Sequence, residues 1–394
     1  MRRVASIGLV SSLCAIGIAG CTPSADSPPS PRASATVTSA AAAPAPAGRE
    51  VGAVLRSPFD VEARRRAVGV PLLDPAPEAL IPPIRDLRGV SFYIDKDHSI
   101  ADPALKRQNE DAVRPVRAFV ARVTGLADDW MRSSPAKPAY AARALDQLAG
   151  WAAAGALLGD VNKQGSYERK WTLGSLALAF LKVRTAPGLD AAKRAATTEW
   201  LVHVARAVMP PYDDLRESSS RNNHAYWAGL AVASVGIAAE DRTLLDWGIA
   251  RAKMGLADVR PDGTLPLEME RGKLALHYHA FALPPLVLLA EIGEANGIPL
   301  YEANDGALKR LAGVVLAGMA DPASFGTLAG TPQTFPLETH PRPAYFAWGE
   351  AYYARFRDPR LLRWLASGMR PLVDARLGGD QTLAFGVEPL PAPP

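Results

Sequence analysis

A polar run precedes an apolar stretch near the middle of the chain. Asn223 and His224 follow three serines and come directly before residues 225–239, which are almost entirely apolar. If this stretch is a helix, both side chains occupy its first turn, where free backbone N–H groups attract a carboxylate and keep an imidazole neutral. Trp227 would lie on the same side and offer a flat surface to a sugar ring. The alternative is that the serines and asparagines only cap the helix and His224 satisfies a buried carbonyl.

A second group of polar residues lies in the segment 266–279. Arg271 and Tyr278 are seven residues apart, so on a helix they share a face about 10 Å apart along the axis and can reach one bound group. His277 and His279 do not share that face and are splayed by about 200° on a helix, so we expect no metal site. The alternative is that Tyr278 belongs to the core and Arg271 pairs with a neighbouring glutamate.

A third polar stretch, residues 162–171, is a loop that runs into a helix and contains Gln164, Tyr167 and Trp171. Amides, basic groups and flat rings together suit an acidic ligand that is rich in hydroxyl groups. An ordinary solvated loop is the alternative. The sequence has no Gly-x-Ser-x-Gly elbow and no phosphate-binding glycine loop.

The elements that must position these residues are predicted to be helices. Leu308, Leu311, Val315 and Met319 recur at steps of three and four residues, which places one apolar stripe on a helix. Alternating strands bounded by turn residues are almost absent, so we predict an all-α domain whose helices form a solenoid, a bundle or a toroid. No fixed repeat is visible, which weakens the solenoid. Further helices are expected at 139–158, 171–183, 190–209, 223–238, 241–257, 271–296, 343–356 and 359–374.

The amino-terminal residues carry an export pattern. Arg2 and Arg3 precede an apolar run over residues 4–19 that is too short for a comfortable membrane span and closes on Cys21. This arrangement resembles a bacterial lipoprotein signal peptide (1–20), in which Cys21 becomes the lipidated first residue. A plain secretory signal is the alternative. We expect a flexible tether of Pro, Ala and Ser over 21–50 and an amino-terminal extension over 51–89.

Composition narrows the function classes further. The 394 residues are 48% hydrophobic and 21% charged, which excludes disorder across the whole chain. Both cysteines, Cys14 and Cys21, lie in the export region, so the body has no disulfide, thiolate ligand or cysteine nucleophile. The net charge is only +4, and the single tight basic run, residues 64–66, is typical of a solvated helix face, so we expect no nucleic-acid partner.

Four stretches together resemble the polysaccharide lyase family 5 alginate lyases, periplasmic enzymes that cleave polymannuronate. They are RKWTLGSLA (169–177), NNHAYW (222–227), LPLE with ALHYH and ALPPL (265–286), and RLGG (376–379). The similarity spans about residues 90–385, which leaves 386–394 as a tail. It implies an (α/α) toroid, an incomplete α/α barrel of helical hairpins with a deep cleft.

The resemblance also implies a site. The family's catalytic positions fall on Asn223, His224, Arg271 and Tyr278. Positions that line its sugar cleft fall on Gln164, Tyr167, Trp171 and His277. The implied partner is an anionic polysaccharide, and the implied reaction is β-elimination at a 4-O-linked uronate with no metal or cofactor.

The expected roles follow from that reaction. Asn223 and Arg271 bind the uronate carboxylate, and Tyr278 protonates the leaving oxygen. Either Tyr278 or His224 takes the carbon-5 proton, and the alternative role of His224 is to keep Tyr278 ionised. Residues 91–98 match the family's lid only loosely, so polymannuronate, polyglucuronate and mixed uronates remain open as substrates.

Two other functions remain open at this point. A toroidal glycoside hydrolase would use a carboxylate pair such as Asp213 with Glu268, although the adjacent acids 128–129 and 213–214 are more typical of surface or capping positions. A non-catalytic lipoprotein would bind an exported polysaccharide without cutting it. Whether the protein is a lyase, a hydrolase or a binding protein, we expect it to be periplasmic and held at the outer membrane through Cys21 alone.

Overall fold

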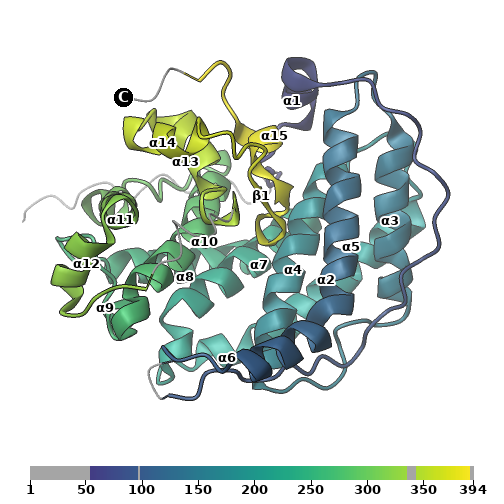
Figure 1. The fold of residues 1–394 in the computed structure, drawn as a ribbon. Helices are drawn as coiled ribbons and strands as arrows, with labels where there is room; N and C mark the ends of the chain where they lie inside the picture. Colours follow the sequence, from purple (N-terminus) through teal and green to yellow (C-terminus); the bar gives the residue numbers. More distant parts are fainter. Residues whose placement is uncertain (1–53, 96–97, 335–342, 391–394) are drawn as a thin grey trace, which may run out of the picture. The chain divides into compact units, whose positions relative to one another are not determined.

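The computed structural model describes residues 54–95, 98–334 and 343–390 (Figure 1). The signal peptide, Cys21 and the tether lie outside these residues, so the predictions for them stay predictions. Within the described ranges the regular elements are helices apart from two short strands, β1 (Val373–Asp374) and β2 (Gly379–Asp380), which pair antiparallel. The all-α prediction is therefore confirmed.

The long helices follow one another through most of the chain. They are α2 (Pro103–Arg132), α3 (Pro138–Ala153), α4 (Lys163–Val183), α5 (Ala191–Val208), α7 (Asn223–Ala239), α8 (Arg242–Ala257), α10 (Ala275–Ala295) and α11 (Ala303–Ala320). Shorter helices are α1 (Val61–Val68), α6 (Pro210–Asp213), α9 (Pro266–Met269), α12 (Pro322–Ala329), α13 (Trp348–Phe356), α14 (Leu362–Leu365) and α15 (Gln381–Phe385).

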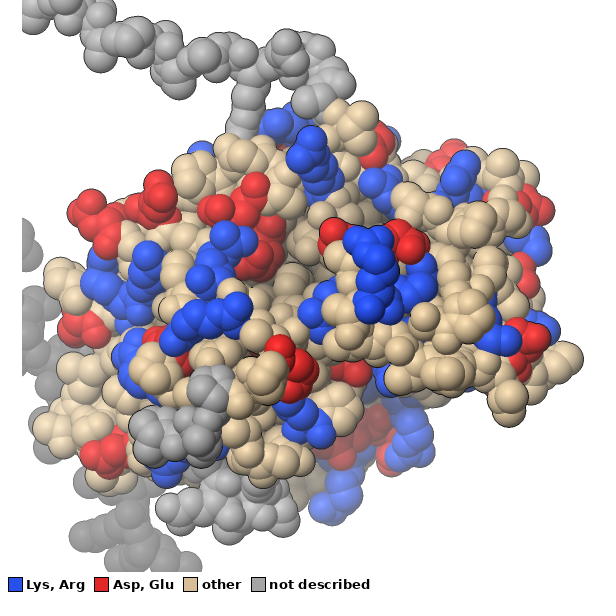
Figure 2. All heavy atoms as spheres, turned by 90° about the horizontal axis from the view of Figure 1, so that it is seen from above, with Lys and Arg blue, Asp and Glu red and all other residues tan. Residues whose placement is uncertain are grey.

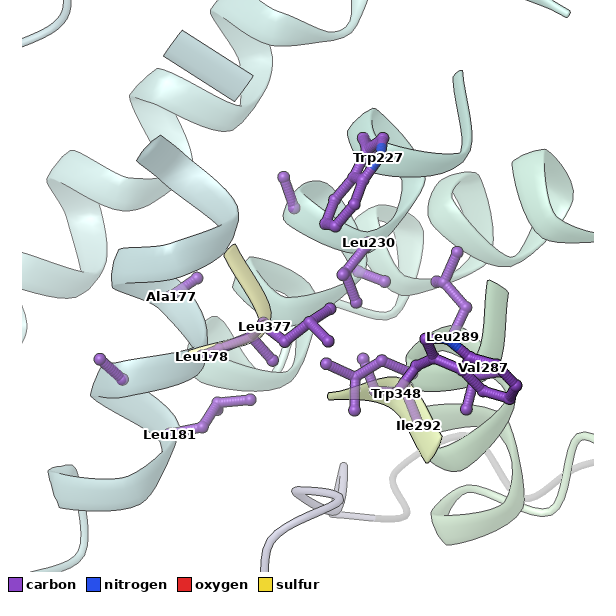
Figure 3. Packing of buried hydrophobic residues seen from close by; sticks show 14 of the residues in the cluster. Ala177, Leu178, Leu181, Trp227, Leu230, Val287, Leu289, Ile292, Trp348 and Leu377 are labelled. Atoms are coloured by element: carbon purple, nitrogen blue, oxygen red, sulfur yellow. The ribbon is translucent and has the colours of Figure 1, made fainter. Parts of the chain in front are cut away.

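Two layers of helices make up the body. Helices α2, α4, α7 and α10 pack against one another in that order, and α3, α5, α8 and α11 pack against them (Figure 1). Every residue of α7 from 225 to 238 is buried, as its apolar composition predicts for a helix covered on all sides. Figure 3 shows side chains of α4, α7, α10 and α13 meeting in the core. This double layer is the toroid of helical hairpins that the sequence resemblance implies.

Helix α10 is strongly apolar, like α7. Within the described residues, the segment Gly272–Ala295 is long and apolar enough to cross a membrane, but 83% of its most apolar window is buried among the other helices. It is therefore a core helix of this fold.

The stretch 162–171, predicted to be a loop that runs into a helix, is itself helical, because α4 begins at Lys163 with the side chain of Asn162 as its cap. The helix predicted over 139–158 ends at Ala153, and the one predicted over 343–356 begins at Trp348 after a 3₁₀ turn.

Two further predicted helices differ at glycines. The helix expected over 271–296 begins at Ala275, because Gly272 adopts a left-handed φ of 53° and opens a short 3₁₀ turn. The helix expected over 359–374 contains only a 3₁₀ turn and α14, and Gly368 with a φ of 79° follows them. In both places glycine permits a backbone turn that apolar periodicity does not reveal.

A buried ion pair fastens the carboxyl-terminal segment to the body. Lys182 Nζ lies 2.6 Å from Asp128 Oδ1 and donates to the carbonyl of Gly378, and Asp380 N donates to Asp128 Oδ2. Gly379 lets the segment come this close, because a Cβ there would collide with the Asp128 carboxylate. These contacts hold the segment that carries Arg376 into the cleft described below.

Replacing Asp128 with alanine is expected to lower the free energy of unfolding by about 3–5 kcal/mol, because Lys182 is left as an unpaired buried charge. Urea unfolding measures this loss. Asp146→Ala is the matched control, since its pair with Lys193 is solvent-exposed and worth less than about 1 kcal/mol. Equal losses in the two variants would contradict the proposed clamp.

Candidate active site

A cleft of about 550 Å³ opens at one end of the inner helices. Its walls come from a hairpin before α2, the first turns of α4, α7 and α10, and the segment after β1. On the face in Figure 2, basic and acidic side chains are intermingled, so no large area of a single sign is visible there. The residues that line the cleft and carry the argument are Tyr93, Gln164, Tyr167, Trp171, Asn222, His224, Arg271, His277, Tyr278 and Arg376.

His224 stands in the first turn of α7, as the sequence predicts, and lines the cleft. Its ring stacks on Tyr167 with centroids 4.1 Å apart, and its Nδ1 lies 3.0 Å from Nζ of Lys170. Burial and then the Lys170 side chain hold the pKa of His224 well below its ordinary value. The imidazole is therefore neutral at neutral pH.

Arg271 and Tyr278 meet, but not along one helix face. Arg271 precedes the 3₁₀ turn and Tyr278 lies within α10, and the guanidinium carbon is 4.7 Å from the phenol ring centroid. Burial, and then Tyr93, raise the pKa of Tyr278, so the resting phenol is protonated. A protonated phenol beside a fixed cation is suited to donate a proton to a leaving oxygen.

Asn223 does not line the cleft. It is completely buried, and both its backbone N–H and its Nδ2 donate to Glu268 Oε1, at 2.8 and 2.9 Å. Glu268 in turn lies 3.8 Å from Nε of Arg271. Asn222 is the asparagine that lines the cleft, and its side chain caps α7 by accepting from the N–H of His224. Glu268 therefore links Asn223 to Arg271 from behind the cleft wall.

The predicted sugar-contacting residues divide into two groups. Gln164, Tyr167, Trp171 and His277 all line the cleft. Trp227 does not fit its predicted role, since it is only 2% exposed and its indole N–H donates to the carbonyl of Phe281. The four-residue spacing placed it on the right side of α7, but neighbouring elements cover that part of the helix.

Arg376 also lines the cleft, although the sequence analysis gave it no role. Its guanidinium is held by Asp374 at 3.0 Å and packs 5.0 Å from the ring centroid of Phe281. It enters the cleft from a segment about 100 residues beyond Tyr278, so helix periodicity offers no signal for it. The RLGG motif was its only sequence signal.

A hairpin covers one side of the cleft. Ile94 N donates to the carbonyl of Ile100, and Asp102 N donates to the carbonyl of Phe92. Tyr278 Oη donates to the carbonyl of His98 at 3.5 Å. Tyr93 and His98, two described residues of the stretch that matches the family's lid only loosely, thus lie against the tyrosine that the reaction needs.

The acidic residues of the hydrolase alternative lie elsewhere. Asp213 accepts from the indole of Trp247 and pairs with Arg251, and it does not line the cleft. Glu268 is completely buried against Asn223. The two carboxylates therefore do not form a pair that faces a common substrate.

His279 is a structural histidine. Its Nδ1 lies 2.7 Å from the carbonyl of Ala275 and its Nε2 accepts from the N–H of Leu265. Among the described residues, no group of three or more His, Cys, Asp or Glu is arranged to hold a metal ion.

Burial lowers the pKa of His279 to about 4 from 6.5. The unfolded chain therefore gains a proton below pH 6.5 that the folded chain binds only near pH 4, so stability falls as pH drops through this window. We expect a loss of up to about 3 kcal/mol from this residue. Unfolding of wild type and His279→Gln from pH 7 to 4 measures it, and equal pH slopes would contradict the assignment.

Comparisons with known proteins agree with this geometry. A family model for alginate lyase matches residues 90–325. A polysaccharide lyase of Stenotrophomonas maltophilia is 39% identical over 302 residues, which cover 76% of this chain and 87% of that protein. The chain belongs to the alginate lyase family.

Other members of the alginate lyase family are similar in sequence and in fold. An alginate lyase of Azotobacter vinelandii is 36% identical over 72% of this chain and 78% of its own length. Among solved structures, alginate lyase A1-III of Sphingomonas species A1 matches with a TM-score of 0.71 and 27% identity, over 86% of this chain and 99% of its own. A variant of A1-III complexed with a tetrasaccharide matches with a TM-score of 0.74 and 27% identity over 86% of this chain and 98% of its own. The toroid and the polysaccharide lyase class predicted from sequence are therefore confirmed.

Proposed function

We propose that this polysaccharide lyase cleaves 4-O-linked polyuronates, polymannuronate first, by β-elimination. The strongest support for this proposal is that the guanidinium of Arg271 lies over the ring of Tyr278, in a cleft that His224 also lines. The family's alginate lyases and the tetrasaccharide bound to A1-III support an anionic polysaccharide as the substrate.

The reaction requires two proton movements. A base removes the proton from carbon 5, the carbon–oxygen bond at carbon 4 breaks, and a double bond forms between carbons 4 and 5. The leaving oxygen takes a proton and becomes the new chain end. The carbon-5 proton is only weakly acidic while the neighbouring carboxylate keeps its full charge, so donors to that carboxylate lower the barrier by several kcal/mol.

The described side chains match these requirements. Arg271 supplies a fixed cation for the carboxylate and the enolate-like intermediate, and Glu268 orients Arg271 and Asn223. Tyr278 donates to the leaving oxygen. The stacked pair of Tyr167 and His224 gives a flat wall for a sugar ring. No step requires a metal or a cofactor.

Ultraviolet absorbance tests this proposal. Each elimination leaves an unsaturated uronate whose double bond is conjugated with its carboxylate, so absorbance rises as polymannuronate is cut. A panel with polyguluronate and polyglucuronate gives the preference. New reducing ends without ultraviolet absorbance would indicate a hydrolase, and binding without new ends would indicate a non-catalytic protein.

We also propose that the protein is exported to the periplasm and anchored at the outer membrane through lipid on Cys21. Three features of the sequence support this proposal: the basic residues Arg2 and Arg3, the short apolar run over 4–19, and Cys21 shortly after it. Metabolic labelling with a fatty-acid analogue should mark wild type and not Cys21→Ser. Equal labelling of both would contradict the anchor.

A further inference from the structure

A fully buried lysine lies behind the cleft wall and has no role in the chemistry described above. Lys170, on α4, has no solvent exposure. Its Nζ lies 3.0 Å from Nδ1 of His224 and over three aromatic rings, at 4.2 Å from the centroid of Tyr167, 4.4 Å from that of Trp171 and 5.5 Å from that of Tyr212. A lysine placed in this way interacts mainly with the histidine and the aromatic faces.

The charge on this pair can be assigned. Burial lowers the pKa of both Lys170 and His224, so two adjacent positive charges are strongly disfavoured. At a separation of 3.0 Å between Nζ and Nδ1, one of the two nitrogens donates and the other accepts. The surrounding aromatic faces and the nearby carboxylate of Glu168 favour the ammonium form.

We propose that Lys170 is a positioning residue that fixes the tautomer of His224. An ammonium group has only donors, so Nδ1 of His224 must accept and the ring proton must lie on Nε2. Because the imidazole lines the cleft, Nε2–H is the group available to a substrate. His224 then acts as a neutral hydrogen-bond donor to the uronate.

This assignment rests on the proposed function and settles a choice that the sequence left open. In this tautomer Nε2 has no free lone pair, so His224 does not take the carbon-5 proton. That step falls to Tyr278: the phenol first releases its proton to solvent in the cleft, although burial raises its pKa, and the phenolate then takes the carbon-5 proton and donates it to the leaving oxygen. Arg271, 4.7 Å from the ring centroid, is the neighbour that lowers the pKa of Tyr278.

Nitrogen NMR of the ligand-free protein tests the tautomer directly. The sequence contains six histidines, so ¹⁵N-histidine labelling gives few signals, and the spectrum of His224→Gln assigns His224. We expect a protonated Nε2 and an unprotonated Nδ1 in wild type, and a shift toward protonated Nδ1 in Lys170→Met. Lys193→Met, an exposed lysine on α5, is the matched control and should leave the signals unchanged.

A protonated Nδ1 in wild type would overturn the proposal, and so would an unchanged His224 signal in folded Lys170→Met. If that variant does not fold, the wild-type spectrum decides alone. This readout needs no turnover, so it stands even if every polyuronate proves inert and the proposed function fails.

Kinetics give a second, independent test. Lys170→Met should lower kcat by up to about 100-fold with little change in KM, because the polymer still binds but the donor is misplaced. His224→Gln, which retains an N–H donor, should keep more activity than His224→Ala. Full activity in Lys170→Met, or equal loss in the two His224 variants, would contradict a donor role fixed by Lys170.

Discussion

Replacing Tyr278 with phenylalanine will lower kcat on polymannuronate by about 10²–10⁴-fold while polymer binding is retained. The change removes only the phenol hydroxyl, which is the proton donor to the leaving oxygen. The ring itself is 8% exposed and packs under the guanidinium of Arg271, so its position should be unchanged. Ultraviolet absorbance gives kcat, and calorimetry with the inactive variant gives the Kd of the polymer.

A matched control separates chemistry from packing. Tyr301 is also buried, its hydroxyl donates to Glu291, and neither residue lines the cleft. Tyr301→Phe should lose roughly 1 kcal/mol of stability and keep wild-type kcat. If Tyr278→Phe were as active as Tyr301→Phe, the proposed general acid would be wrong.

Replacing Arg271 with alanine is expected to lower kcat/KM by about 10²–10³-fold, the usual cost of removing one fixed donor to a developing negative charge. The guanidinium also neighbours the buried carboxylate of Glu268, at 3.8 Å, which would lose its closest cation. Arg271→Lys should recover only part of the activity, because it restores the charge without the planar fork. Initial rates across polymer concentrations separate kcat from KM.

Arg260→Ala is the control for this series. Arg260 is an exposed arginine on the turn before α9 and does not line the cleft. Its removal should change the rate less than twofold at moderate salt, because solvent and ions screen the charge of an exposed side chain outside the cleft. If Arg260→Ala lost as much activity as Arg271→Ala, the overall positive charge of the protein would drive catalysis, and not the position of the Arg271 guanidinium.

Much of the fold followed from local patterns. Residues 225–238 are apolar on nearly every side, and a helix of that kind must be covered by other helices. In the structure α7 is buried over these residues. Helix starts near 138, 191 and 242 agree with the predicted ranges to within a residue or two. The start of α10 and the end of α14 could not be predicted from the apolar pattern. Gly272 and Gly368 turn the backbone at positions where that pattern continues.

The candidate site was predicted less evenly. Residue type and motif identified His224, Arg271 and Tyr278, which share the cleft. Spacing gave the side of α7 on which Trp227 lies, but periodicity does not reveal the neighbouring elements that bury it. Asn223 was expected to face the substrate, and its donors are instead bound by Glu268.

The sequence by itself determined the helical class, the export pattern and the chemical groups available for elimination, because these depend on composition, periodicity and motifs within short stretches. Only the tertiary structure decided that Lys170 contacts His224 and that Arg376 reaches the cleft. Those contacts join residues more than 50 positions apart, and a hydrogen bond depends on distances of a few ångströms that only the packing of whole helices sets.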